Sequence, residues 1–503
     1  MTSRLKVIAG VTAALAALAV FRRRRRANGK KPPASDPSGF IDLCRLIRAG
    51  SPSVFFAQRR GVLGDTFTLA FPLKCVVFTN VDDIIAITAL ENRLNMSIKM
   101  PPAYEALHGQ DLLLSKGSAH KIWRRTFNAV VSPRALESYL PRIISAFGAM
   151  WTSLAALGGE EVVLRDHIRR AQLRVMADIL FGITFAGPGG EEAFQKLDRD
   201  FQQEVGALFA LPLNIPGTTF HKGMKAARRI RGLLATRFKE ESQRFSKSDV
   251  PVTLQGKERP LRNAIDAVIE MLRSSDPEVR KLGDDEALIV NNLLLLLEAS
   301  HGTTMYATTA LMAELHRPES ADALAQLREE VAAMTSSGAT LDLQAVGSMK
   351  YADACINEIL RLYPFAGGIP KFLPPGEVLD VRGTQFEGPT DLQLYFSHAF
   401  VDADLFPEPL AFRPQRWLKT CVPENLRASE TARKSFMPMG LGSHICLGAS
   451  LARLSMKSML IAYCQGAFHM HLTGQVERVP DIIPEWKVKD GCRARVYNRA
   501  QGA

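Results

Sequence analysis

The sequence predicts a mainly α-helical protein with a minor β part. Helical periodicity dominates from about residue 100 to about residue 360, where prolines and glycines separate the helical segments. Strand-like runs precede that region, and further short ones alternate with Pro/Gly turns beyond residue 370. The chain is 503 residues long, 47% hydrophobic and 23% charged, which is typical of packed globular proteins.

The first element is an apolar segment, Val7–Phe21, followed at once by Arg22–Arg26. As a helix it is about 22 Å long, against a hydrocarbon core of about 30 Å, and its flanking basic side chains can snorkel to the interface. The arginine run favours retention of the following chain on the cytoplasmic side. We therefore predict an N-terminal membrane anchor over residues 1–26, with a cleaved secretory signal and an acid-poor organelle presequence as alternatives.

The second segment, residues 27–39, contains KKPPASDPSG and is predicted to be a stiff hinge. Residues 40–503 are predicted to form a single domain.

Residues 1–31 hold nine basic side chains and no acidic one, which leaves +3 of the net charge of +12 for the rest. This distribution argues for a membrane and against a nucleic-acid partner. The seven scattered cysteines include no CxxC pair and favour a reducing compartment.

The body should begin with a β-hairpin, formed by Gly64–Phe71 and Cys75–Asn80, and a helix at VDDIIAITAL. The clearest helix begins at Asp284 and continues to His316, before Pro318. It would be about 45 Å long and cross the whole domain. Polar residues interrupt its LLLLL run, so a buried core helix is favoured over a membrane span.

The stretch FMPMGLGSHICLGASLA places one cysteine, Cys446, between two glycines and before a predicted helix. Glycines allow backbone N–H groups to approach a sulfur, and a helix N-terminus supplies positive potential that favours a thiolate. The segment MGLGSHICLG fits the haem-binding loop F-x-x-G-x-[RH]-x-C-x-G of the cytochrome P450 superfamily, with Met439 where phenylalanine is usual. Taken alone, the motif could also be a buried cysteine in a glycine-rich turn.

The resemblance extends over nearly the whole chain. It implies the P450 fold, with a long central helix over haem b, and it makes residues 40–503 a haem-thiolate catalytic domain. Cys446 would be the axial iron ligand, flanked by Gly442 and Gly448, and His444 would reach a haem propionate.

Two other segments resemble the family's propionate-binding positions. GSAHKIWRR resembles G-x-x-[WH]-x-x-x-R, so that His120 and Arg124, one helical turn apart, would bind one propionate. A basic surface helix is the alternative. Lys371 stands where an arginine to the other propionate is common, and a lysine offers a point charge without the bidentate fork.

The segment NEILRLYP places Glu358 and Arg361 on one helix face, where they can pair. Downstream, FPEPLAFRPQRW resembles the family's F-x-P-x-R-[FW] segment, whose Arg416 would complete a Glu–Arg–Arg network. The resemblance implies that this network holds the fold around the haem and takes no part in the reaction.

EASHGTT in the long helix resembles the family's [AG]-G-x-[DE]-T-[TS] pattern, in which Thr303 and Thr304 would be the catalytic hydroxyl residues that assist oxygen activation. Gly302 replaces the acid of the pattern. Water near Gly302, or the adjacent His301, is then the candidate proton route. Alternatively, the Thr303 hydroxyl bonds back to its own helix.

The function implied is a haem-thiolate monooxygenase that inserts one oxygen atom from O2 into an apolar small-molecule substrate. LPLNIPGTTFHKGMKAARR is similar to a segment of family members that oxidise isoprenoid lipids such as steroids, terpenoids and retinoids. An isomerase or dehydratase acting on a peroxide without a reductase, and a haem-based sensor, are the alternatives.

The chain contains no G-x-G-x-x-G nucleotide-binding motif, so electrons would come from NADPH through a separate reductase, with cytochrome b5 as a further candidate donor. The expected location is the endoplasmic reticulum membrane with the catalytic domain facing the cytoplasm. A plastid or mitochondrial membrane is the alternative.

Overall fold

The computed structural model describes residues 51–69, 74–246, 263–335, 341–418, 428–466 and 468–498. The predicted anchor, residues 1–26, and the predicted hinge, residues 27–39, lie outside the described residues.

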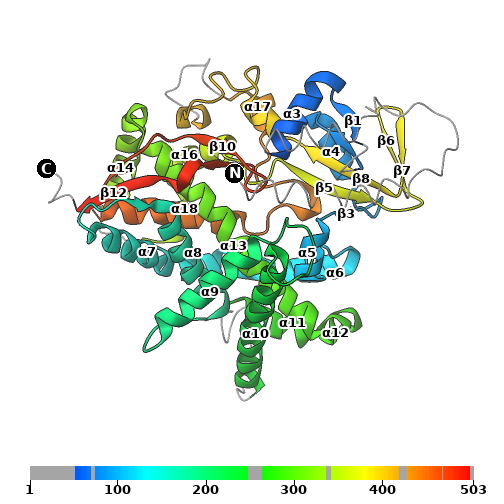
Figure 1. Cartoon of the computed structure of the whole chain (residues 1–503), viewed down its shortest axis with the longest axis horizontal. Helices are drawn as coiled ribbons and strands as arrows, with labels where there is room; N and C mark the ends of the chain where they lie inside the picture. Colours follow the sequence, from blue (N-terminus) through cyan, green and yellow to red (C-terminus); the bar gives the residue numbers. More distant parts are fainter. Residues whose placement is uncertain are drawn as a thin grey trace.

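The body is mostly helical with a small sheet part, which confirms the predicted fold class (Figure 1). Its core helices are α7 (Pro133–Ala155), α8 (Leu164–Phe181), α13 (Glu286–Leu315), α16 (Lys350–Leu362) and α18 (Ala449–Gln465). The remaining helices are α3 (Pro52–Leu63), α4 (Val81–Ala89), α5 (Pro102–His108), α6 (Gly117–Asn128), α9 (Gly190–Val205), α10 (Thr219–Ser246), α11 (Ala264–Leu272), α12 (Pro277–Gly283), α14 (Ala321–Thr335), α15 (Leu343–Gly347) and α17 (Glu430–Ser435).

The long central helix is α13, and its bounds agree with the predicted Asp284–His316 to within two residues. Its N-cap is Asp285, whose carboxylate accepts a hydrogen bond from the Leu288 N–H at 2.9 Å. Apolar side chains lie all round this helix, so it is stable only where neighbours cover every face. It contacts α8, α10, α16 and α18 and forms the middle of the core.

The main sheet lies on one side of the helical body, at the upper right of Figure 1, in the order β1-β2-β8-β5-β3. Its strands are β1 (Thr66–Leu69), β2 (Cys75–Phe78), β8 (Thr390–Tyr395), β5 (Gly368–Leu373) and β3 (Ser97–Ile98). Strands β1 and β2 pair antiparallel with Thr66 opposite Phe78, as the hairpin prediction requires, and α4 follows them. Strand β2 is parallel to β8, which brings two segments that are far apart along the chain into one sheet.

Smaller sheets complete the β part. One has the order β4-β12-β9, with β4 (Val162–Val163), β12 (Arg493–Asn498) and β9 (Phe468–Leu472). The other two are hairpins, β6 (Val378–Val381) with β7 (Thr384–Glu387), and β10 (Arg478–Pro480) with β11 (Trp486–Val488).

One helical stretch in the described part of the chain, Gly442–Gln465, is apolar and long enough to cross a membrane. Most of it is α18, and 56% of its most apolar window is buried inside the fold. Because α18 packs on α7 in the middle of the main core cluster, we assign it as a core helix.

Candidate active site

A large cavity lies between α13 and the loop that precedes α18. Its empty volume is about 1040 Å³, including the part that opens to solvent, at the upper end of the sizes usual for small-molecule sites. The walls are mostly apolar, with a few polar side chains among them. Seven of the residues predicted from sequence line it: His120, Arg124, Thr303, Thr304, His444, Cys446 and Gly448.

Cys446 lies two residues before Gly448, the N-cap of α18, and its exposed surface lines the cavity. The Cys446 N–H donates to the Met439 carbonyl at 2.8 Å, which closes the loop. Burial raises the pKa of the Cys446 thiol, while the Gly448 N–H and the charge of Arg124 act in the opposite direction. Burial has the larger effect, so the protein alone favours the neutral thiol, and a bound metal ion would be needed to produce the thiolate.

The two glycines of this loop have different roles. Gly442 has a φ of 71° and starts the short 3-10 turn η7 (Gly442–His444). A Cβ on Gly442 would lie 2.5 Å from the Thr88 side chain and 2.6 Å from a Glu91 oxygen, so no side chain fits there. A Cβ on Gly448 would have no described atom within 4 Å. Gly448 is thus not required by its protein neighbours, and the cavity lies beside it.

Three nitrogen-bearing side chains, His120, Arg124 and His444, line one part of the cavity. The rings of His120 and His444 lie 4.3 Å apart between centroids, tilted by 34°. Burial, together with the charges of Lys371 and His120, lowers the pKa of His444 to about 3. The His444 Nε2 is buried without a hydrogen-bond partner, and among the described residues Arg124 has no hydrogen-bond or ion-pair partner. These donors are available to an anionic group in the cavity.

Lys371 does not line this cavity; it is fully buried in β5, and its ammonium pairs with the Glu91 carboxylate. The same carboxylate accepts from the Ser443 N–H, next to His444. Glu91 was not predicted from sequence, because a lone glutamate after a helix carries no signal. It connects the end of α4 to the cysteine loop.

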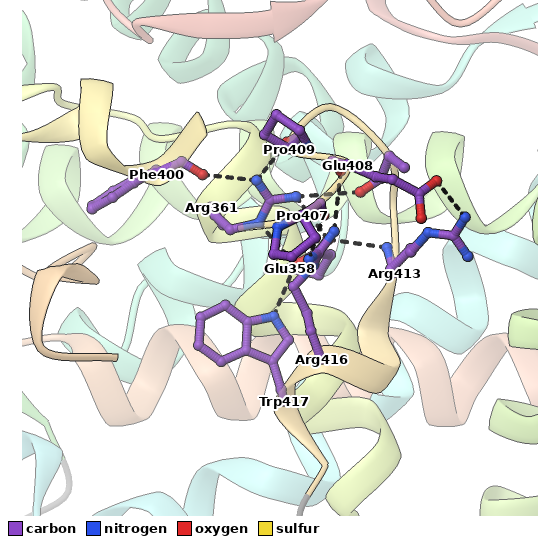
Figure 2. Close-up of polar contacts among 10 residues, drawn as sticks. Glu358, Arg361, Phe400, Pro407, Glu408, Pro409, Arg413, Arg416 and Trp417 are labelled. Atoms are coloured by element: carbon purple, nitrogen blue, oxygen red, sulfur yellow. Dashed lines mark hydrogen bonds and ion pairs between the residues drawn. The ribbon is translucent and has the colours of Figure 1, made fainter. Parts of the chain in front are cut away.

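The structure brings Glu358, Arg361 and Arg416 together in a fully buried network (Figure 2). Arg361 donates to both Glu358 oxygens, from Nε at 2.9 Å and from Nη2 at 2.8 Å. Arg416 Nε adds a third bond at 3.0 Å. The Glu358 carboxylate accepts two further hydrogen bonds that sequence reasoning missed, from Trp417 Nε1 at 2.9 Å and from the Arg413 N–H at 3.0 Å. Trp417 is the last residue of the FRPQRW segment, so the role of Trp417 could have been predicted from that motif.

Both guanidinium groups also donate hydrogen bonds to backbone carbonyls that lie outside any β-strand. Arg361 donates to the carbonyls of Phe400, Pro409 and Ala411, and Arg416 donates to those of Pro407 and Glu408. One carboxylate thereby positions the irregular segment from 400 to 417 against α16 (Figure 2). Such a cluster contributes mainly by satisfying buried polar groups that would otherwise be unpaired.

Helix α13 brings Thr303 and Thr304 to the cavity wall. The Thr303 hydroxyl donates to the Ala299 carbonyl at 3.0 Å, the alternative that sequence analysis had left open. His301 is a different case. It does not line the cavity, its Nε2 lies 3.1 Å from the Arg169 carbonyl on α8, and burial lowers its pKa to about 3. The suggested proton route through His301 is therefore not supported by its position.

Gln172 on α8 is a cavity residue that the sequence did not indicate. Its Nε2 donates to the Ser300 carbonyl at 3.1 Å, and its Oε1 accepts from the Ser455 hydroxyl at 2.9 Å. It therefore bridges α13 and α18 and fixes the helix that carries Thr303 relative to the helix that follows Cys446.

These residues fit the haem that the resemblance implies. A thiol lies at a helix N-terminus on the cavity wall, and unpaired donors for carboxylates lie on one side of it. Cys446 would hold the iron, and His120, Arg124 and His444 would bind propionates.

Comparison with known proteins agrees with this geometry. The family model "Cytochrome P450" matches residues 39–483. Cytochrome P450 26B1 of Danio rerio is 26% identical over 457 residues, covering 88% of this chain and 82% of that protein. Ent-kaurenoic acid oxidase 2 of Arabidopsis thaliana is 25% identical over 476 residues, covering 92% of this chain and 86% of that protein.

A solved structure of a cyanobacterial enzyme, CYP120A1 bound to retinoic acid, has the same fold. It superposes with a TM-score of 0.76 at 23% identity and covers 93% of this chain and all of that chain.

Proposed function

This chain belongs to the cytochrome P450 family and is a cytochrome P450 monooxygenase, and from that premise we propose that it oxidises an apolar, isoprenoid-like substrate with electrons from a separate reductase. The observation that carries the proposal is the cavity in which Cys446 and Thr303 share one apolar space. Insertion of one oxygen atom from O2 leaves the second as water and requires two electrons. No module for delivering them is recognisable in the sequence, so NADPH would act through a partner, a reductase with cytochrome b5 as an additional donor.

A haem bound through the Cys446 thiolate would supply oxygen activation, because the thiolate donates electron density that favours O–O cleavage. The chain's own residues do the rest. His120, Arg124 and His444 would bind the haem propionates. Lys371 pairs with Glu91 and so stabilises the loop that contains His444. The Thr303 hydroxyl, released from the Ala299 carbonyl, can donate a hydrogen bond into the cavity, and Thr304 lies beside it.

The substrate class is supported by the cavity and by its surroundings. Leu112, Leu113, Leu295 and Leu296 give the cavity an apolar wall. Between α9 and α10, the side chains of Leu211, Leu213 and Ile215 are exposed, which suits the entry of an apolar molecule. The relatives' names include a kaurenoic acid oxidase and a retinoic acid-bound enzyme, so isoprenoid carboxylic acids are the first substrates to test.

For location, we propose a single N-terminal membrane anchor over residues 1–26 and one catalytic domain over residues 40–503. The support is the apolar segment and the arginine run that follows it. The endoplasmic reticulum with the domain facing the cytoplasm is the proposed site.

The test uses the full chain with haem, in membranes, with NADPH, a P450 reductase and either retinoic acid or ent-kaurenoic acid. We expect a product one oxygen atom heavier that requires all components, and a red-shifted carbon monoxide band in the reduced protein. Cys446→Ser should lose both, whereas Cys464→Ser, on α18 away from the cavity, should keep both. Turnover of a peroxide without reductase would instead indicate an isomerase or dehydratase, and spectral binding without product would indicate a sensor.

A further inference from the structure

Three side chains from three helices converge in a buried cluster beside the cavity. His108 ends α5, Glu204 lies in α9, and Glu298 lies in α13. The His108 Nε2 is 2.9 Å from Glu204 Oε1 and 2.7 Å from Glu298 Oε2. The side chains of His108 and Glu204 are completely buried, and that of Glu298 is 15% exposed.

The protein alone does not satisfy this arrangement. An imidazole Nε2 carries at most one hydrogen, which cannot point at two carboxylate oxygens from different helices. In the structure the Nε2 is within bonding geometry of Glu204 only, and Glu298 Oε2 remains without a hydrogen bond. The second oxygen of Glu204, Oε2, and His108 Nδ1 are also buried without a hydrogen-bond partner. Buried polar atoms left in this state are rare and indicate a missing partner.

The charges of the cluster lead to the same conclusion. Asp111, also fully buried, has Oδ2 3.7 Å from His108 Nδ1, so three carboxylates surround one imidazole. The nearby cation Arg231 is bonded to neutral groups, the carbonyl of Leu107 and the side-chain oxygen of Asn291. Buried excess negative charge is stable only when it is protonated or when it binds a cation.

We propose that His108, Glu204 and Glu298 bind one divalent transition-metal ion of the zinc type through Nε2, Oε1 and Oε2. One imidazole and two carboxylates are ligands that zinc accepts, at bond lengths of about 2.0–2.2 Å. Tetrahedral bonds of that length separate ligand atoms by about 3.3 Å, so the carboxylates need to move outward by only about half an ångström.

Asp111 completes the arrangement as a positioning residue. A metal-binding histidine usually gives its other N–H to a carboxylate, which fixes the ring orientation. Here Asp111 faces Nδ1 and is itself held by the Tyr104 hydroxyl, which donates to Oδ2 at 2.7 Å. The Tyr104 ring stacks on the His108 ring with centroids 4.3 Å apart, so the imidazole is fixed from a second direction.

The metal ion would connect α5, α9 and α13, which are far apart along the chain. Leu112 and Leu113, just after Asp111, line the cavity, as do Leu295 and Leu296 before Glu298. The ion would therefore hold the part of the cavity wall where these helices meet. This inference does not depend on the proposed function, since its readouts are metal content and stability.

The experiment starts from the haem-loaded protein, treated with a chelator and then dialysed against Zn²⁺ alone. We expect about one zinc per chain by elemental analysis, and a higher unfolding temperature that the chelator reverses. Glu204→Gln and Glu298→Gln keep the size of the side chain and should each weaken zinc binding by at least about tenfold. Glu191→Gln, an exposed position on the same α9 helix, is the matched control and should bind zinc as the parent does.

The carbon monoxide spectrum of each variant verifies that it has folded around its haem. If Glu204→Gln loses haem, Glu298→Gln, at the partly exposed position, decides the question together with the parent's own metal content. The proposal is overturned if the parent takes up no zinc in stoichiometric amount, or if the variants retain it like Glu191→Gln. Either result would identify the cluster as a purely protonated network and would leave the monooxygenase assignment unchanged.

Discussion

Lys371 and Glu91 form a buried ion pair next to the cysteine loop, although 280 residues separate them along the chain. The Glu91 carboxylate also accepts the Ser443 N–H, so one acid joins β5, the end of α4 and the loop that contains Cys446. Burial alone would raise the pKa of Glu91, but its hydrogen bonds with Lys371 and Ser443 bring it below its ordinary value.

Loss of one partner of this pair should be costly. In Glu91→Ala, the Lys371 ammonium remains buried without a counter-charge, and we expect the free energy of unfolding to fall by about 3–5 kcal/mol. Denaturant unfolding of the haem-loaded protein measures this. The double variant Glu91→Leu/Lys371→Met should recover much of the loss. If Lys371 served a haem propionate only, Glu91→Ala would be nearly neutral and Lys371→Met would lose haem selectively.

The Glu358 network predicts a combined loss of fold and haem. Glu358→Ala leaves two buried guanidinium groups without their carboxylate, and we expect a cost of about 3–5 kcal/mol with little haem-replete protein recovered. Arg413→Ala removes a neighbouring but exposed pair with Glu408 and should cost at most about 1 kcal/mol. A folded, haem-replete Glu358→Ala protein would contradict the structural role of the network.

Thr303 should affect the reaction more than binding. Its hydroxyl lines the cavity and is bonded only to its own helix, so Thr303→Ala should leave substrate-induced spectral binding within about twofold. Product formed per NADPH consumed should fall by about tenfold or more, because proton delivery is lost. Thr303→Ser, which keeps the hydroxyl, should retain the parent's ratio of product formed to NADPH consumed. An equal loss in Thr303→Ser would show that the methyl group matters instead.

Stability should fall in mild acid because of buried neutral histidines. His316 lies with Nδ1 2.7 Å from the Met312 carbonyl and Nε2 2.7 Å from the Tyr463 hydroxyl, and burial lowers its pKa to about 4. The unfolded chain has an ordinary histidine pKa of about 6.5 and binds the proton first, so stability is full above pH 6.5 and declines toward pH 4.

Between pH 7 and pH 4.5, this one group accounts for up to about 2–3 kcal/mol of the decline in unfolding free energy. His316→Gln should reduce the pH dependence by that amount when denaturant midpoints are compared at the two pH values. An unaltered slope in His316→Gln would contradict the assignment of a buried neutral ring.

Much of the site could be predicted from sequence because its chemistry is local. The cysteine, the glycines and the helix start around Cys446 lie within a few residues, and the pairing of Glu358 with Arg361 follows from one helical turn. The bounds of α13 and the first hairpin follow from capping and alternation in the same way. His301 marks the limit of this reasoning, because sequence places it next to Gly302 but does not reveal that it faces α8.

The sequence alone determined the mainly helical class, the cysteine loop and the long central helix, since periodicity and short motifs carry that information. Tertiary structure alone decided which distant groups meet: Glu91 with Lys371, Gln172 with Ser300, and His108 with Glu204 and Glu298. The physical reason is that a buried polar group needs a partner but places no condition on where that partner stands in the chain. Only the packing of α4, α5, α8, α9 and α13 selects it.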